Sequence, residues 1–127
     1  MPVWRTRPVE EQSTLTLEAW KVIELPGGDR HLVGYCIENR EGRVSSVIRD
    51  FDPSSLRAKT KTGRVYRLRG GPGANLDAEY VWGIWARVNF ASSWTDVTEL
   101  AWNEHLAVST VRPSVESRYR RRRRGES

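Results

Sequence analysis

Six basic side chains and no acidic one occupy residues 57–69, and this segment carries the strongest chemical signal in the sequence. Lys and Arg bind nucleic acid by neutralising phosphates and releasing counterions. On an edge hairpin, the same residues can instead form a solvated face that discourages sheet-to-sheet aggregation. The segment therefore predicts a polyanion-binding surface, with a plain solvated edge as the alternative. Its cations are Arg57, Lys59, Lys61, Arg64, Arg67 and Arg69.

A second basic segment lies near the C-terminus. Residues 112–127 hold seven Arg and two Glu, so they account for the whole formal charge of +5. Such charge blocks are usually interaction tails, and an aromatic ring among them can stack on a base. We expect this tail to be flexible and to contact nucleic acid or an acidic protein surface. The residues concerned are Arg118, Tyr119, Arg120, Arg121, Arg122, Arg123 and Arg124.

Catalytic chemistry has one candidate arrangement. His31 or His105 with Glu38 or Glu104 could act as general base and acid in metal-independent RNA cleavage. No spacing supports such a pair, and the simpler alternative is a pair of structural histidines. One Cys and two His far apart in sequence do not make a zinc site, and no serine-hydrolase or phosphate-binding glycine motif is present. The sequence predicts no catalytic site, no metal and no cofactor.

Tryptophan is unusually frequent, with six residues in the chain. Trp20, Trp85 and Trp94 fit strand or helix patterns and are expected in the core. Trp82 and Trp102 fit these patterns less well. Because Trp often anchors protein interfaces, these two are candidates for a protein-binding surface.

Length and composition limit the fold to one domain. The chain has 127 residues, of which 38% are hydrophobic and 29% charged, enough for a single core. No apolar run approaches the ~20 residues of a membrane helix, and the N-terminus lacks a secretory signal. The single cysteine, Cys36, lies in an apolar run and is expected to be a buried thiol. These features predict a soluble, cytoplasmic protein with no membrane partner.

Hydrophobic alternation predicts a meander of strands followed by a hairpin. Turn-forming residues separate three expected strands, at residues 15–25, 31–38 and 43–51. The hairpin arms, residues 56–60 and 64–69, flank a three-residue loop that ends in Gly63. This loop pairs Thr60 with Arg64, Ala58 with Tyr66 and Leu56 with Leu68, so one face is mainly apolar. The cations at 57, 59, 67 and 69 should share the opposite, exposed face.

One helix is expected at about residues 78–89, capped by Asn75 or Asp77. Its apolar stripe of Val81, Ile84, Trp85 and Val88 would pack on the concave side of the sheet. A sixth strand is expected at 94–100, and residues 101–111 fit either strand or helix. The predicted fold is mainly β with one α-helix, a small antiparallel, partly open barrel of SH3-like or OB-like kind. An irregular arm (1–13) precedes this domain (14–111), and the basic tail (112–127) follows it.

The middle third of the chain also carries a resemblance. The segments Phe51–Pro53, Thr62–Leu68, Gly71–Gly73 and Tyr80–Trp82 resemble a pattern in short uncharacterised open reading frames of proteobacterial phages and mobile elements. The resemblance implies a setting of DNA maintenance, DNA transfer or inhibition of host defence, and supplies no catalytic residue.

Two functions remain open on this basis. The first is a non-enzymatic nucleic-acid-binding module, for DNA or RNA, that uses the basic hairpin and the tail. The second is a protein-binding inhibitor or adaptor, of anti-defence type, that acts on a host protein or nucleoprotein complex through Trp82, Trp102 and the cations.

Overall fold

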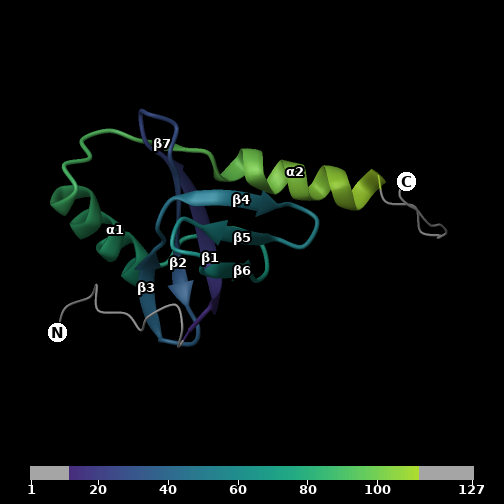
Figure 1. Cartoon of the computed structure of the whole chain (residues 1–127), viewed down its shortest axis with the longest axis horizontal. Helices are drawn as coiled ribbons and strands as arrows, with labels where there is room; N and C mark the ends of the chain where they lie inside the picture. The colour runs from purple at the N-terminus through teal and green to yellow at the C-terminus, as the bar shows by residue number, and fades with distance from the viewer. Residues whose placement is uncertain (1–11, 112–127) are drawn as a thin grey trace.

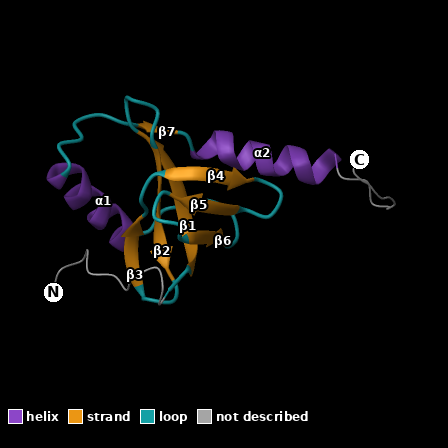
Figure 2. Ribbon diagram, viewed as in Figure 1, coloured by secondary structure: helices purple, strands orange, loops and turns teal. Residues whose placement is uncertain are grey.

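The structure is a computed structural model that describes residues 12–111, and within this range the chain is mainly β with two helices (Figures 1 and 2). The N-terminal arm up to residue 11 and the arginine-rich tail from residue 112 lie outside the described residues. The elements are β1 (Thr14–Glu24), β2 (Arg30–Cys36), β3 (Glu41–Val44), β4 (Ile48–Asp52), β5 (Arg57–Thr60), β6 (Val65–Leu68), α1 (Leu76–Val88), β7 (Thr95–Asp96) and α2 (Thr98–Val111).

Two antiparallel meanders form the sheet, and its order is β3-β2-β1-β6-β5-β4, with β7 paired to β1. The meanders meet at a parallel pair of β1 and β6, which runs from Thr14 opposite Val65 to Leu17 opposite Leu68. The expected antiparallel sheet is therefore a mixed one. It is not closed, because β3 and β4 remain as its two edges.

The expected third strand, 43–51, is two strands joined by residues 45–47. Ser45 causes the break. Its backbone N–H donates to the carbonyl of Leu32, and its hydroxyl oxygen accepts the Leu32 N–H at 2.8 Å. The side chain thus ends the pairing with β2, and the chain is free to cross to β5.

Partway along β1, the set of side chains that face the core switches from odd to even positions. Leu15 and Leu17 are buried in the main core, but Ala19 has φ 47° and the pairing with β2 shifts at this point. Beyond this bulge the even positions Trp20 and Val22 enter the core. The uniform alternation expected from 15 to 25 is therefore wrong, because a bulge adds a residue and reverses the faces.

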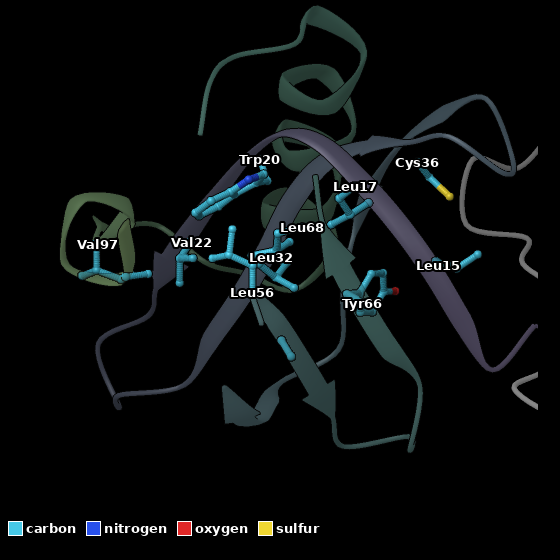
Figure 3. Packing of buried hydrophobic residues seen from close by; sticks show 12 residues of the cluster. Leu15, Leu17, Trp20, Val22, Leu32, Cys36, Leu56, Tyr66, Leu68 and Val97 are labelled. Carbon is cyan, nitrogen blue, oxygen red and sulfur yellow. The ribbon is translucent and has the colours of Figure 1, made fainter. Parts of the chain in front are cut away.

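The main core lies on the enclosed side of the curled sheet. It gathers side chains from β1, β2, β5 and β6, and the residue that precedes α2 closes one end (Figure 3). Trp20 is fully buried there, and its Nε1 donates to the carbonyl of Gly70. The core residues labelled in Figure 3 are Leu15, Leu17, Trp20, Val22, Leu32, Cys36, Leu56, Tyr66, Leu68 and Val97.

α1 covers the other face of β2 and β3 (Figure 1). Asn75 caps it by accepting the N–H of Ala78, as the sequence predicts for one of two candidates. Ala78, Trp82 and Ala86 form a second core with Ile23 and Val33. Because Ile23 and Val33 are strand neighbours of main-core residues, they point to the opposite face. The expected docking of the helix on the concave side is therefore wrong.

α2 is a second helix, and it covers residues 101–111, for which the sequence fits either a strand or a helix. Only Thr95–Asp96 of the expected strand 94–100 is extended. The helix starts at Thr98, whose N–H donates to the Asp96 carboxylate and whose hydroxyl accepts the Val22 N–H. Along α2, Nδ1 of His105 lies 2.6 Å from the carbonyl oxygen of Pro53, just after β4, and the helix extends away from the sheet (Figure 1). Neither helix in the described range is long and apolar enough to cross a membrane.

Candidate nucleic-acid interface

The β5–β6 hairpin has the register that its loop length predicts. Ala58 lies opposite Tyr66, and the N–H of Leu68 donates to the carbonyl of Leu56. Gly63 takes φ 94° in the loop, a conformation that L side chains rarely adopt. The pairing expected from the sequence is confirmed.

This register separates cations from apolar side chains. Four exposed cations alternate along the hairpin with buried residues of the main core, and Arg57 lies directly opposite Arg67. Like charges directly opposite each other on a sheet face destabilise the pair. The hairpin keeps this repulsion on its outer face, which we call the cationic face. The cationic face consists of Arg57, Lys59, Arg67 and Arg69.

Carboxylates border the cationic face on both sides. On β4, Asp52 lies opposite Arg57 and Asp50 lies opposite Lys59, and on β1 the Glu18 carboxylate is 3.2 Å from Nε of Arg69. Ser54 and Ser55 occupy the Asp52 carboxylate with hydrogen bonds, which hold its pKa below the usual value. Among the four cations, only Arg69 forms an ion pair within residues 12–111.

Two cations of the segment lie elsewhere. Arg64 is 6% exposed, and its Nε donates to the carbonyl of Gln12 at 2.8 Å. It lies next to the turn on the inward side of the hairpin, and the Thr60 N–H donates to its carbonyl, as the loop length predicts. Arg64 is therefore not on the exposed face with the other candidate cations. Lys61 is exposed at the turn, and both side chains line a cavity that is described below. The tail candidates, Arg118 to Arg124 with Tyr119, lie outside the described residues.

The tryptophan candidates for a protein interface are largely covered. Trp82 is 6% exposed and stacks on Trp85 at a centroid distance of 5.2 Å. Trp102 is half-buried, with its ring edge-on to Trp20. The expectation that Trp82 is available to a partner is wrong, because the helix turns this residue into the second core. Trp94, expected in the core, is 44% exposed.

Replacing Trp82 with alanine is therefore expected to destabilise the fold. The loss of a buried indole costs about 3–5 kcal/mol, measurable as the free energy of unfolding in urea. Trp94→Ala, which removes a more exposed ring, is the control and should cost clearly less. A Trp82→Ala chain as stable as the wild type would contradict this placement.

Among residues 12–111, no hydrogen bond or ion pair joins either histidine to either of the glutamates considered for acid–base chemistry. Nδ1 of His31 is 2.8 Å from the carbonyl oxygen of Ser45, and Nδ1 of His105 is 2.6 Å from that of Pro53. Glu38 receives the N–H and the hydroxyl of Thr16, each at 2.7 Å. Glu104 is exposed on α2. These contacts hold loops and strands together, and among the described residues no three His, Cys, Asp or Glu side chains gather as metal ligands.

Glu38 gives the stability a predictable pH dependence. Burial acts to raise the pKa of its carboxyl, but the hydrogen bonds from Thr16 outweigh burial and lower the pKa below 4.5. A carboxyl whose pKa is lowered by folding stabilises the fold at pH values above its ordinary, unfolded-state pKa. This stabilisation is lost as the pH falls through the pKa of the folded state. Burial also raises the pKa of the neighbouring Cys36 thiol.

Glu38→Gln is expected to cost about 1 kcal/mol at neutral pH, since the site is partly exposed. It should also flatten the decline of stability in acid. Urea unfolding across roughly pH 3 to 7 measures both effects, and Glu104→Gln is the control. Parallel acid profiles for Glu38→Gln and wild type would contradict the assignment.

An apolar ridge that the sequence pattern did not lead us to expect lies on the outer side of α1. Leu76 is 88% exposed and Tyr80, one helical turn further on, is 66% exposed, so these two residues lie on one side of the helix. Val88, which the sequence places in the stripe that packs on the sheet, is instead 60% exposed, so that expectation is wrong for this residue. Phe90, just past the helix, is 92% exposed with φ 56°. The i, i+4 spacing of Leu76 and Tyr80 could have revealed this ridge, but the expected stripe of Val81, Ile84, Trp85 and Val88 includes neither residue.

No protein-family model, curated protein or solved structure matches this chain.

Proposed function

We propose that this chain is a non-enzymatic nucleic-acid-binding module and that the cationic face of the β5–β6 hairpin contacts the phosphates of DNA or RNA. The observation that carries this proposal is the direct opposition of Arg57 and Arg67 on an exposed face. If a nucleic-acid backbone lay between the two guanidinium groups, its phosphates would attract both groups and offset the repulsion between them.

The shape of the hairpin supports this use. A two-stranded ribbon can enter a groove or follow a backbone. Arg57, Lys59 and Arg67 have no ion pair with a described residue, so binding a phosphate would break none of the described ion pairs. The barrel of SH3-like or OB-like kind that the sequence predicts remains part of the proposal, as a scaffold that holds the hairpin rigid.

The tail adds affinity without sequence preference in this proposal. Phosphate contacts position a protein, and base contacts specify the sequence. The residues proposed here contact phosphates, apart from Tyr119, which could stack on any base. The module has no catalytic residue and no cofactor, and we place it in the cytoplasm.

Fluorescence anisotropy with labelled single-stranded DNA, duplex DNA and RNA tests the proposal. The full chain should bind at low salt, and its affinity should fall steeply as salt rises. Deleting residues 114–127 should weaken all three affinities while leaving measurable binding. The proposal fails if the full chain binds none of the three at low salt.

The ridge on α1 favours a second candidate function, a protein-binding adaptor or anti-defence inhibitor of phage or mobile-element origin. Exposed Leu76, Tyr80 and Phe90 make a contact surface rich in aromatic area. Phe90 also holds a left-handed backbone, which costs roughly 1 kcal/mol for a residue other than glycine. Capture of a host protein that survives nuclease and is lost in Tyr80→Ser would favour this function. Loss of capture after nuclease treatment favours the first.

A further inference from the structure

A cavity of about 450 Å³ lies where the sheet fails to close. One wall is the edge strand β3 and the 45–47 connection that leads to the other edge strand, β4. The turn of the β5–β6 hairpin and the start of β6 form a second wall, and Val81 and Trp85 of α1 form a third. This volume is within the usual range of small-ligand sites.

A buried arginine, Arg43, lines this cavity, and one of its guanidinium nitrogens lacks a hydrogen bond to a described residue. Arg43 is 6% exposed, and its Nε donates to the Tyr66 hydroxyl at 2.8 Å. Its Nη1 is 3.8 Å from a Glu41 carboxylate oxygen and has no hydrogen-bond partner among residues 12–111. Buried guanidinium donors are rarely left unpaired, because each one costs free energy. An acceptor group from a ligand would satisfy this nitrogen.

The charges around the cavity select an anion. Lys61 and Arg64 line it together with Arg43, and Glu41 is the carboxylate of the lining. Burial raises the pKa of the Glu41 carboxyl and so disfavours its charged form, whereas the nearby positive charge of Arg43 lowers this pKa. Among the lining residues, three cations stand against one carboxylate, and this balance suits a doubly charged group such as a phosphate monoester.

The rest of the lining suits the organic part of such a ligand. Val44, Val47 and Val81 provide apolar surface, and the half-buried Trp85 provides an aromatic ring. The hydroxyls of Thr62 and Ser46 can donate to oxygen atoms between the two parts. The cavity thus has a cationic part and an apolar, aromatic part.

We propose that this cavity binds a nucleoside monophosphate, with the phosphate at Arg43, Lys61 and Arg64 and the base against Trp85 and the valines. This site is separate from the proposed binding of a nucleic-acid strand to the hairpin, since it uses none of the cations of the cationic face. The monophosphate has two possible sources, a free nucleotide or the phosphorylated end of a strand, and both present the same group.

Isothermal titration of the full chain with AMP and UMP tests the site. Both should bind, and adenosine and uridine should bind at least about tenfold more weakly, because a charged hydrogen bond contributes that much or more. Inorganic phosphate should compete. A 5′-phosphorylated tetranucleotide that binds as well as AMP identifies a strand end as a source, and failure of this tetranucleotide alone restricts the site to free nucleotides. No binding of AMP or UMP at millimolar concentration overturns the proposal, as does equal binding of the nucleosides.

Two lysines provide a matched pair of variants. Lys61→Ala should reduce AMP affinity about tenfold. Lys59→Ala is two residues away on the cationic face and should leave AMP affinity unchanged. Arg43→Gln should reduce it further, and if this variant does not fold, the lysine pair decides. Equal AMP affinities for the two lysine variants overturn the site, whereas strand binding by the hairpin stands or falls separately through Arg57 and Arg67.

Discussion

Replacing both Arg57 and Arg67 with glutamate should reduce the affinity of the full chain for nucleic acid by at least about 100-fold at low salt. The two side chains lie opposite each other on the exposed outer face of the hairpin, so the change turns a paired cationic site into a paired anionic one. Loss of two phosphate contacts should also reduce the slope of log K against log salt by about 1.4 on single strands and about 1.8 on duplex DNA. Anisotropy titrations at several salt concentrations measure both quantities.

A matched control separates the site from net charge. Arg40 and Arg87 are exposed on the β2–β3 turn and on α1, away from the hairpin. Reversing both changes the formal charge by the same amount and should weaken binding far less. Equal weakening by the two double variants would show that only total charge or the tail matters.

Gly42→Ala should destabilise the fold by about 3 kcal/mol, near the top of the usual range for an overpacked site. A Cβ at residue 42 would lie 2.4 Å from the backbone carbonyl carbon and oxygen of Asp77 and 2.5 Å from the nitrogen of Ala78. These are backbone atoms of the first turn of α1, so no side chain can move aside. The helix would have to leave β3, and urea unfolding measures the cost.

Gly83→Ala is the control for this change. Gly83 is exposed in the middle of α1, and a Cβ there meets nothing within 4 Å. Alanine should stabilise the chain by up to about 1 kcal/mol, because glycine is a poor helix former. Equal stability changes for the two variants would contradict the close contact between α1 and β3.

The hairpin could be predicted from the sequence because its signals are local. Loop length, Gly63 and the alternation of Arg57, Ala58 and Lys59 together fix one register, and the structure has that register. The cap at Asn75 is another local signal. In both cases neighbouring residues along the chain determine the geometry.

The failures involve contacts between distant parts of the chain. The parallel pairing of β1 with β6 joins residues about 50 positions apart, and no loop length encodes it. The face of α1 that packs is determined by where Gly42 lets the helix approach, which brings Trp82 inward. The loop length already turns Arg64 inward, but the Gln12 carbonyl that accepts its Nε–H comes from a distant part of the chain and could not be predicted.

The two candidate sites differ in the same respect, since one depends on local sequence and the other on contacts between distant residues. The cationic face lies on one hairpin and follows from its register, so the sequence could locate it. The cavity needs Arg43 from β3, Lys61 from the hairpin turn and Trp85 from α1. These residues become neighbours only when both meanders and the helix have assembled, so residue spacing alone could not indicate the cavity.

A titration of the isotopically labelled full chain with a short oligonucleotide, followed by amide NMR shifts, tests the central claim most directly. The largest shifts among residues 12–111 are expected at Arg57, Lys59 and Arg67 and should disappear at high salt. Shifts concentrated on α1 between Leu76 and Val88, or no shifts within 12–111 while the tail still binds, would contradict the assignment of the hairpin as the nucleic-acid surface.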